Sequence, residues 1–170
     1  SLTTRYKLLQ TANIPENKQL RALLKERCAR DIVYWINNFG YTYDPRCEPA
    51  FLPMILFPKQ EEFLRFIEQC ESEQVDAIVE KSRDAGVTWL CCFFLVHRWL
   101  FREGFKGSIG SRKEDLVDKN GDPDCIFHKI KQIIERLPWW MKPVGLQENK
   151  HYKHLLLSNP EEESTITGEA

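Results

Sequence analysis

The sequence predicts an α/β protein in which a mostly parallel sheet is flanked by helices. An apolar run at residues 75–80 precedes a long apolar helical pattern at residues 87–102, and a short strand pattern follows at residues 106–110. A strand, a helix and a second strand in this order predict a right-handed crossover between parallel strands. The helix is apolar nearly all round, so we expect it to be buried on several sides.

The composition describes a folded protein with a substantial core. The chain has 170 residues, of which 42% are hydrophobic and 12% aromatic, and its net charge is −1. This charge gives no overall attraction to nucleic acid or to an anionic membrane. The six cysteines contain no C-x-x-C pair, so we expect free thiols in a reducing compartment. The longest apolar run, residues 87–96, is too short to span a bilayer, and we expect a soluble, intracellular protein.

The first part of the chain, residues 1–50, is predicted to be a helical, lid-like segment with a connector. Residues 1–15 are polar, and we expect them to be loose; helical spacing begins at Leu20. Asp31 is placed to cap a second short helix that Gly40 ends. Residues 41–58 contain four prolines and indicate an extended connector.

The second part, residues 51–170, holds the predicted sheet. Pro58 suits the first turn of a helix that leads to the strand at residues 75–80. A further helix is expected to begin at Asp122–Pro123 and to end before Pro138. Residues 154–158 and 164–168 predict two strands around a turn at residues 159–161.

The segment between the predicted strand and the long helix has the layout of a phosphate-binding loop. The usual pattern is G-x-x-x-x-G-K-[ST]. Gly86 and Thr88 fit this pattern, whereas Lys81 stands at the first glycine position and Val87 at the lysine position. The candidate phosphate-binding residues are Lys81, Ser82, Arg83, Asp84, Ala85, Gly86, Val87 and Thr88. The alternative is an ordinary strand-to-helix turn in which Lys81 and Arg83 are solvated.

Four of the loop residues have a chemical reason to contact a nucleotide. Gly86 allows the backbone to approach a phosphate closely, at the N-terminus of a helix. The Thr88 hydroxyl is placed to bind Mg²⁺ beside the phosphates. Lys81 and Arg83 are the candidate phosphate cations, and the sequence leaves open which of them is the main one.

A second candidate residue, Gln60, lies one helix upstream of the loop. An amide offers a donor and an acceptor together, which matches the Hoogsteen edge of adenine. Many ATP-driven nucleic-acid motors carry a glutamine at this place. The alternative is a solvent-facing glutamine on the first helical turn.

These motifs, in this order, resemble the large terminase subunit of tailed bacteriophages or of a prophage. The resemblance spans residues 31–170 and is carried by Gln60 and by residues 34–40, 81–89, 110–118 and 166–170. It implies that residues 51–170 are the N-terminal portion of a P-loop ATPase domain of the additional-strand type. It also supports Lys81 at the loop start, and Arg83, as phosphate contacts.

The resemblance further implies ATP and Mg²⁺ as cofactors and the packaging of double-stranded viral DNA into a procapsid as the activity. The implied partners are the portal protein and the small terminase subunit, with no membrane. The implied location is the host bacterial cytoplasm, at the procapsid portal. A C-terminal metal-dependent nuclease domain would cut concatemeric DNA.

ATP hydrolysis in this class needs an apolar strand that ends in Asp–Glu. The chain contains no such strand, and the family places it just beyond the position of Ala170. We therefore expect the N-terminal part of a longer protein, truncated before the catalytic-carboxylate strand. Such a fragment should be monomeric and bind nucleotide weakly with Mg²⁺, with negligible turnover.

Three alternatives stay open at the level of sequence. Another P-loop ATPase or helicase would share the loop, whereas a kinase or GTPase-like switch would normally keep a lysine where Val87 stands. A non-enzymatic interaction module with a degenerate loop is favoured by the tryptophans at positions 35, 139 and 140. His97, on the apolar helix, is predicted to be a hydrogen-bonded core histidine.

Overall fold

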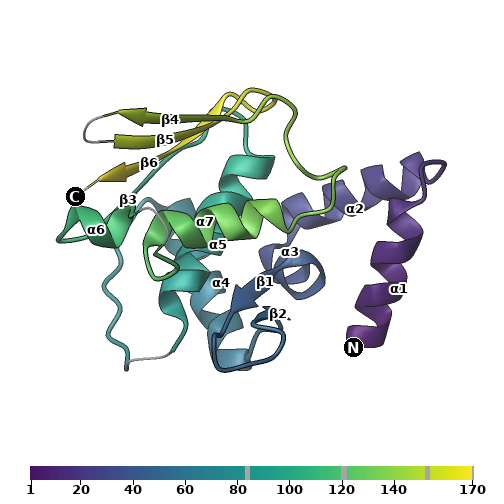
Figure 1. The fold of residues 1–170 in the computed structure, drawn as a ribbon, viewed down its shortest axis with the longest axis horizontal. Coiled ribbons are helices and arrows are strands. Elements are labelled where there is room, and N and C mark those ends of the chain that lie inside the picture. Colours follow the sequence, from purple (N-terminus) through teal and green to yellow (C-terminus); the bar gives the residue numbers. More distant parts are fainter. Residues whose placement is uncertain (83–84, 120–121, 152–153, 170) are drawn as a thin grey trace.

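The structure is a computed structural model of the chain, and it describes residues 1–82, 85–119, 122–151 and 154–169. It is an α/β fold in which a four-stranded mixed sheet lies along one side of a layer of helices (Figure 1). The two termini lie on opposite sides of the molecule. The elements are, in order, α1 Leu2–Asn13, α2 Lys18–Arg30, α3 Ile32–Phe39, β1 Tyr41–Tyr43, β2 Phe51–Pro53, α4 Pro58–Glu73, α5 Val87–Phe101, β3 Lys106–Gly110, α6 Glu114–Val117, α7 Ile126–Glu135, β4 Gln147–His151, β5 His154–Asn159 and β6 Ser164–Glu169.

The sheet has the strand order β3-β6-β5-β4. Among the described strands of this sheet, β3 and β6 are the one parallel pair, while β5 pairs antiparallel with both β6 and β4. The prediction of a mostly parallel sheet is therefore wrong. The reason is the short connection of residues 160–163 between β5 and β6, because a few residues can join antiparallel neighbours but not parallel ones.

The β5–β6 hairpin is attached to the end of α5 by two buried polar side chains. Asn159 Nδ2 and Ser164 Oγ both donate to the Trp99 carbonyl oxygen, at 2.9 Å and 2.6 Å. This carbonyl lies in the last turn of α5, where carbonyls lack intrahelical partners. The two hydrogen bonds fix the sheet against the helix that carries the candidate loop.

Residues 75–80, all of them described, form neither a strand nor a helix and are exposed. Ile78 is 97% exposed, and Figure 1 shows the connection from α4 to α5 swinging out beside the helices. The parallel neighbour of β3 is instead β6, from the other end of the chain. The predicted buried strand is wrong, because an apolar run shows only that a segment suits burial and not that the sheet has a place for it.

The predicted long helix and the short strand after it are confirmed as α5 and β3. Helix α5 is surrounded by α2, α3, α4, α7 and the sheet, as its apolar pattern predicts. The predicted β5–β6 strand pair around a turn is also confirmed. Strand β4 was not predicted from the sequence.

Two predictions for the N-terminal part of the chain are wrong. Residues 2–13, expected to be loose, form α1, and the buried Arg5 of this helix donates to the carbonyl oxygens of Asn37 (3.2 Å) and Gly40 (2.7 Å) at the end of α3. A cation at a helix C-terminus is favoured by the helix dipole, and this long-range contact is invisible in local sequence. Within residues 41–58, expected to be an extended connector, Tyr41–Tyr43 and Phe51–Pro53 pair as the antiparallel β1–β2 hairpin.

The predicted cap of the second short helix is confirmed. Asp31 Oδ1 accepts hydrogen bonds from the backbone N–H groups of Val33 (3.1 Å) and Tyr34 (3.2 Å) at the start of α3. Helix α4 begins at Pro58 as predicted. In the described part of the chain, no helix is long and apolar enough to cross a bilayer.

One hydrophobic core joins the N-terminal helices to the sheet. Trp35 of α3 packs edge-on against Phe93 of α5, with ring centroids 5.8 Å apart. His97 is buried beside Trp35, and its Nε2 lies 2.8 Å from the Cys28 carbonyl oxygen. The prediction of a hydrogen-bonded core histidine is confirmed.

Candidate functional site

The N-termini of α4 and α5 meet at one place, and this brings the two sequence-predicted motifs together. Gln60, in the first turn of α4, donates from Nε2 to the Ala85 carbonyl oxygen at 3.4 Å. A Cβ atom added to Gly86 would lie 3.1 Å from the same nitrogen. Each helix N-terminus carries a partial positive charge, so their convergence favours an anion.

The N-terminus of α5 has uncapped backbone N–H groups that suit such an anion. Gly86 is the N-cap residue, with a positive φ of 75°, and no side chain among the described residues caps this end. The first turn is Val87, Thr88 and Trp89, so its backbone N–H groups have no carboxylate neighbour within that turn. Thr88 is exposed on this turn.

Gln60 holds the two helix ends in place. Its Oε1 accepts from the Phe57 backbone N–H at 3.1 Å, which gives a partner to the N-cap N–H group at the start of α4. Its Nε2 bond to Ala85 is long for a hydrogen bond and joins the segment before α5 to α4. The amide therefore has a structural role in this state of the protein, and only the longer bond is readily exchanged for a ligand.

The β1–β2 hairpin faces these helix ends and encloses a cavity of about 600 Å³. This volume falls within the range of about 300–1,000 Å³ that is usual for small-ligand sites. The cavity is lined by residues 42–46 and 52–55 of the hairpin region, by Phe57 and Gln60, and by Gly86 and Trp89. We call it the α4–α5 cleft.

The cleft combines aromatic rings with an ion pair on the hairpin. Tyr43, Phe57 and Trp89 supply the rings. The Arg46 guanidinium donates to both carboxylate oxygens of Asp44 at 2.8 Å. These hydrogen bonds, together with one from the Arg46 backbone N–H, lower the pKa of Asp44 to about 2. Asp44 is therefore a poor proton acceptor at neutral pH.

The hairpin is held in position by stacking. The Phe51 ring lies 4.9 Å from the Tyr43 ring, and the guanidinium of Arg136, the C-cap residue of α7, lies over Phe51 at 3.4 Å. Sequence reasoning missed the hairpin residues of the cleft. The alternation of Tyr41, Thr42 and Tyr43 was the one local signal for a strand there.

The other predicted site residues are close to Gly86 in the sequence, but Lys81, Ser82 and Thr88 are not among the residues that line the cleft. Lys81 and Ser82 are exposed and irregular, and Arg83 and Asp84 lie outside the described residues. Within the described ranges, no group of three or more His, Cys, Asp or Glu side chains could hold a metal ion. Magnesium binding by Thr88 stays a prediction.

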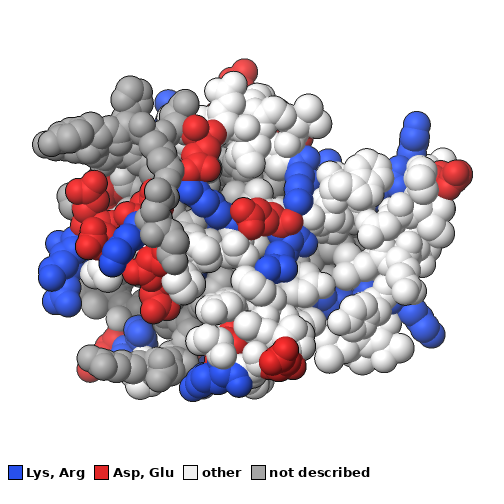
Figure 2. Space-filling model, viewed as in Figure 1, with Lys and Arg blue, Asp and Glu red and all other residues white. Residues whose placement is uncertain are grey.

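The basic residues of α7 are engaged inside the protein. Lys129 Nζ donates to the carbonyl oxygens of Pro123 and Asp124, and Lys131 pairs with Glu148 at 2.6 Å. Figure 2 shows basic and acidic side chains interspersed over the visible face. Lys129 and Lys131 therefore each have a partner within the protein.

No protein-family model and no curated protein sequence matches this chain. Its function is therefore inferred from the α4–α5 cleft and from the loop that leads into it.

Proposed function

We propose that the α4–α5 cleft binds a nucleoside triphosphate with Mg²⁺, in the nucleotide-binding part of a DNA-packaging ATPase of the large terminase type. The observation that supports this proposal is the uncapped N-terminus of α5 beside Gln60 in one cavity of about 600 Å³. An uncapped helix N-terminus favours phosphate, and the aromatic rings opposite it favour a planar base.

Each end of the nucleotide has its own contacts in this proposal. The phosphates lie at the backbone N–H groups of residues 86–88, with Lys81 and Arg83 as cations and the Thr88 hydroxyl on Mg²⁺. The base lies between Trp89 and the hairpin. It takes the place of the Ala85 carbonyl as the partner of Gln60 Nε2.

The proposal assigns nucleotide binding, but not nucleotide hydrolysis, to this chain. The carboxylate that lines the cleft is Asp44, which is paired with Arg46 and has a pKa of about 2. An ATPase of this class needs one carboxylate to hold Mg²⁺ and another to activate water. We therefore propose that this chain binds nucleotide with negligible turnover. DNA translocation, the nuclease, the portal and the small subunit then belong to the longer protein.

A titration with a fluorescent ATP analogue tests the proposal. Lys81→Ala and Arg83→Ala should each raise the Kd about tenfold, because each removes a charge-assisted contact worth about 1.4 kcal/mol. Removal of Mg²⁺ with EDTA should also weaken binding. Lys59→Ala is the matched control, because Lys59 is exposed on the first turn of α4, pairs with Glu62 and does not line the cleft.

The interaction module is the second candidate function. Exposed apolar side chains support it: Ile78 lies beside Phe63 and Phe66 of α4, and Trp139 is 60% exposed. Unchanged analogue binding in Lys81→Ala, Arg83→Ala and the control would contradict the nucleotide proposal and favour this one.

A further inference from the structure

Six charged side chains form a continuous ladder of ion pairs that joins α3, α4 and α5. We call it the α4–α5 ladder, and its members in order are Asp31, Arg65, Glu68, Arg98, Glu71 and Arg102. The successive N–O distances are 2.7, 2.9, 3.3, 2.8 and 2.7 Å. Charges of opposite sign alternate along it, so each interior member is shared by two partners.

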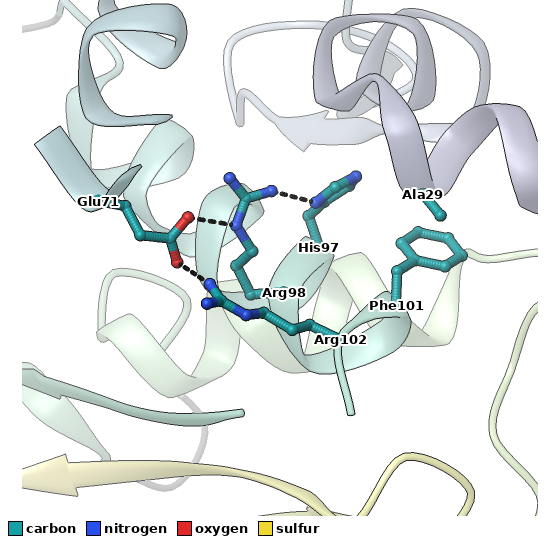
Figure 3. Close-up of a pocket in the computed structure, with 6 residues that line it drawn as sticks. All are labelled: Ala29, Glu71, His97, Arg98, Phe101 and Arg102. Atoms are coloured by element: carbon teal, nitrogen blue, oxygen red, sulfur yellow. Dashed lines mark hydrogen bonds and ion pairs between the residues drawn. The ribbon is translucent and has the colours of Figure 1, made fainter. Parts of the chain in front are cut away.

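Arg98 is one of the two middle members of this ladder, and Glu71 connects it to Arg102. Glu71 accepts from Arg98 Nε at 2.8 Å and from Arg102 Nη1 at 2.7 Å, so one carboxylate of α4 holds two arginines of α5 (Figure 3). Arg98 is only 13% exposed at its side chain. Ion pairs shielded from water in this way are stronger and less screened by salt than exposed ones.

The ladder is also tied to α2 through His97. Arg98 Nη1 lies 2.9 Å from His97 Nδ1, and His97 Nε2 lies 2.8 Å from the Cys28 carbonyl oxygen. An arginine only donates, so Nδ1 is the acceptor and the ring is the neutral tautomer with its proton on Nε2. Arg98 thus connects Glu68 and Glu71 of α4 to the backbone of α2.

The ladder and the cleft lie at opposite ends of the same two helices. Gln60 and Gly86 stand at the N-terminal ends of α4 and α5, and Glu71 and Arg98 stand in their last turns. At a rise of 1.5 Å per residue, the two ends are separated by about 16 Å on α4 and about 18 Å on α5. A change in the angle between the helices at the ladder therefore changes the distance between Gln60 and Gly86.

Helix α4 buries few of its side chains completely. Of its sixteen residues, all described, only Leu64 and Cys70 are buried. Apolar contacts are non-directional, whereas paired carboxylates and guanidiniums fix a distance and an angle. The ladder is thus well suited to set the orientation of α4 against α5.

We propose that Glu71 and Arg98 are positioning residues for the α4–α5 cleft: they hold α4 at the angle to α5 that places Gln60 against the segment before Gly86. This proposal rests on the proposed function where it concerns nucleotide affinity. Neither residue lines the cleft, so its effect on the ligand passes through the helices.

The decisive variant is Glu71→Gln, which keeps the shape of the side chain and removes the charge that binds both arginines. The matched control is Glu26→Gln, because Glu26 forms an exposed pair with Arg30 within α2. Two properties are measured: the Kd of the ATP analogue, and the NMR crosspeaks of the Gln60 side-chain amide and the Gly86 backbone amide without nucleotide. If Glu71→Gln fails to fold, Glu68→Gln removes one member and leaves Glu71 in place.

We expect Glu71→Gln to shift both crosspeaks by more than their linewidths and to raise the Kd at least fivefold, with no effect in Glu26→Gln. A general loss of stability would lower the urea midpoint without moving these two crosspeaks selectively. Wild-type crosspeaks in a folded Glu71→Gln protein overturn the positioning role. Failure of the wild-type protein to bind the analogue overturns the proposed function instead, and the crosspeaks still decide the positioning role.

Discussion

At the scale of residues, the buried polar side chains of this protein bind mostly to backbone carbonyl groups. Arg21 of α2 donates to the carbonyl oxygens of Ala12, Ile14 and Pro15, which fixes the turn between α1 and α2. Arg5 and Asn159 do the same at the ends of α3 and α5. Each of these contacts supplies a partner to a carbonyl near the end of a helix, where intrahelical partners are missing.

The buried His97 side chain predicts how the stability of the protein depends on pH. Burial lowers its pKa from 6.5 to about 4, although the Cys28 carbonyl raises it in part. The unfolded chain therefore takes up a proton as the pH falls through about 6.5, while the folded protein does not until about pH 4. Stability is complete above this window, and we expect a loss of about 2 kcal/mol between about pH 7.5 and pH 5.

Urea unfolding at the two pH values measures this loss. His97→Gln removes the titrating group and should reduce the difference between the two pH values. His128→Gln on α7 is the control and should keep the wild-type difference. An unchanged pH dependence in His97→Gln would show that another group is responsible.

At the scale of elements, the start of α5 depends on the left-handed conformation of Gly86. Gly104 has a similar positive φ, 66° against 75°, and a Cβ added there meets nothing within 4 Å. The two glycines therefore differ in their surroundings and hardly at all in their backbone strain. Comparing alanine substitutions at Gly86 and Gly104 therefore separates an effect on the cleft from the effect of backbone strain.

We expect Gly86→Ala and Gly104→Ala each to lower the free energy of unfolding by about 1 kcal/mol. Only Gly86→Ala brings a methyl group within 3.1 Å of Gln60 Nε2, so only this variant should raise the Kd of the ATP analogue severalfold. Equal affinity in both variants would argue against a role of the Gln60 contact in nucleotide binding. Urea unfolding and analogue titration supply the two measurements.

At the scale of the whole molecule, the connection from α4 to α5 lies outside the sheet. The chain passes from α5 to β3, and β3 then pairs with β6 rather than with the apolar run before α5. Ile78 and Val79 of that run instead line a shallow surface hollow together with Phe63 and Phe66 of α4. The candidate loop therefore follows an exposed segment and not a sheet strand.

This arrangement predicts the response to two isoleucine truncations. Ile78→Ala should change the free energy of unfolding by no more than about 0.5 kcal/mol, because Ile78 is 97% exposed. Ile166→Ala in β6 should cost about 2–5 kcal/mol, because this side chain is fully buried. If Ile78→Ala lowered the free energy of unfolding as much as Ile166→Ala, residues 75–80 would be buried, as the sequence predicts. Urea unfolding measures both.

Local signals predicted a large part of the fold. The cap at Asp31, the proline that begins α4 and the apolar pattern of α5 each act through neighbouring residues, and each is confirmed. For the candidate site, the sequence picked out Gln60 and the glycine before α5, and in the structure Gln60 donates a hydrogen bond to Ala85, the residue before this glycine. The hairpin wall of the cleft was missed, because its strands are three residues long and its position depends on Arg136, the C-cap residue of α7.

The sequence by itself determined the cap and the end of α3, the start of α4, the extent of α5, and that Gln60 belongs with the N-terminus of α5. Hydrogen bonds and periodicity within a few residues are enough to fix these features. Only the tertiary structure decided that residues 75–80 stay outside the sheet, that the β1–β2 hairpin closes the cleft, and that the α4–α5 ladder joins the two helices. Strand pairing and ion pairing depend on which distant segment competes best for the same place, and a local pattern carries no information on that competition.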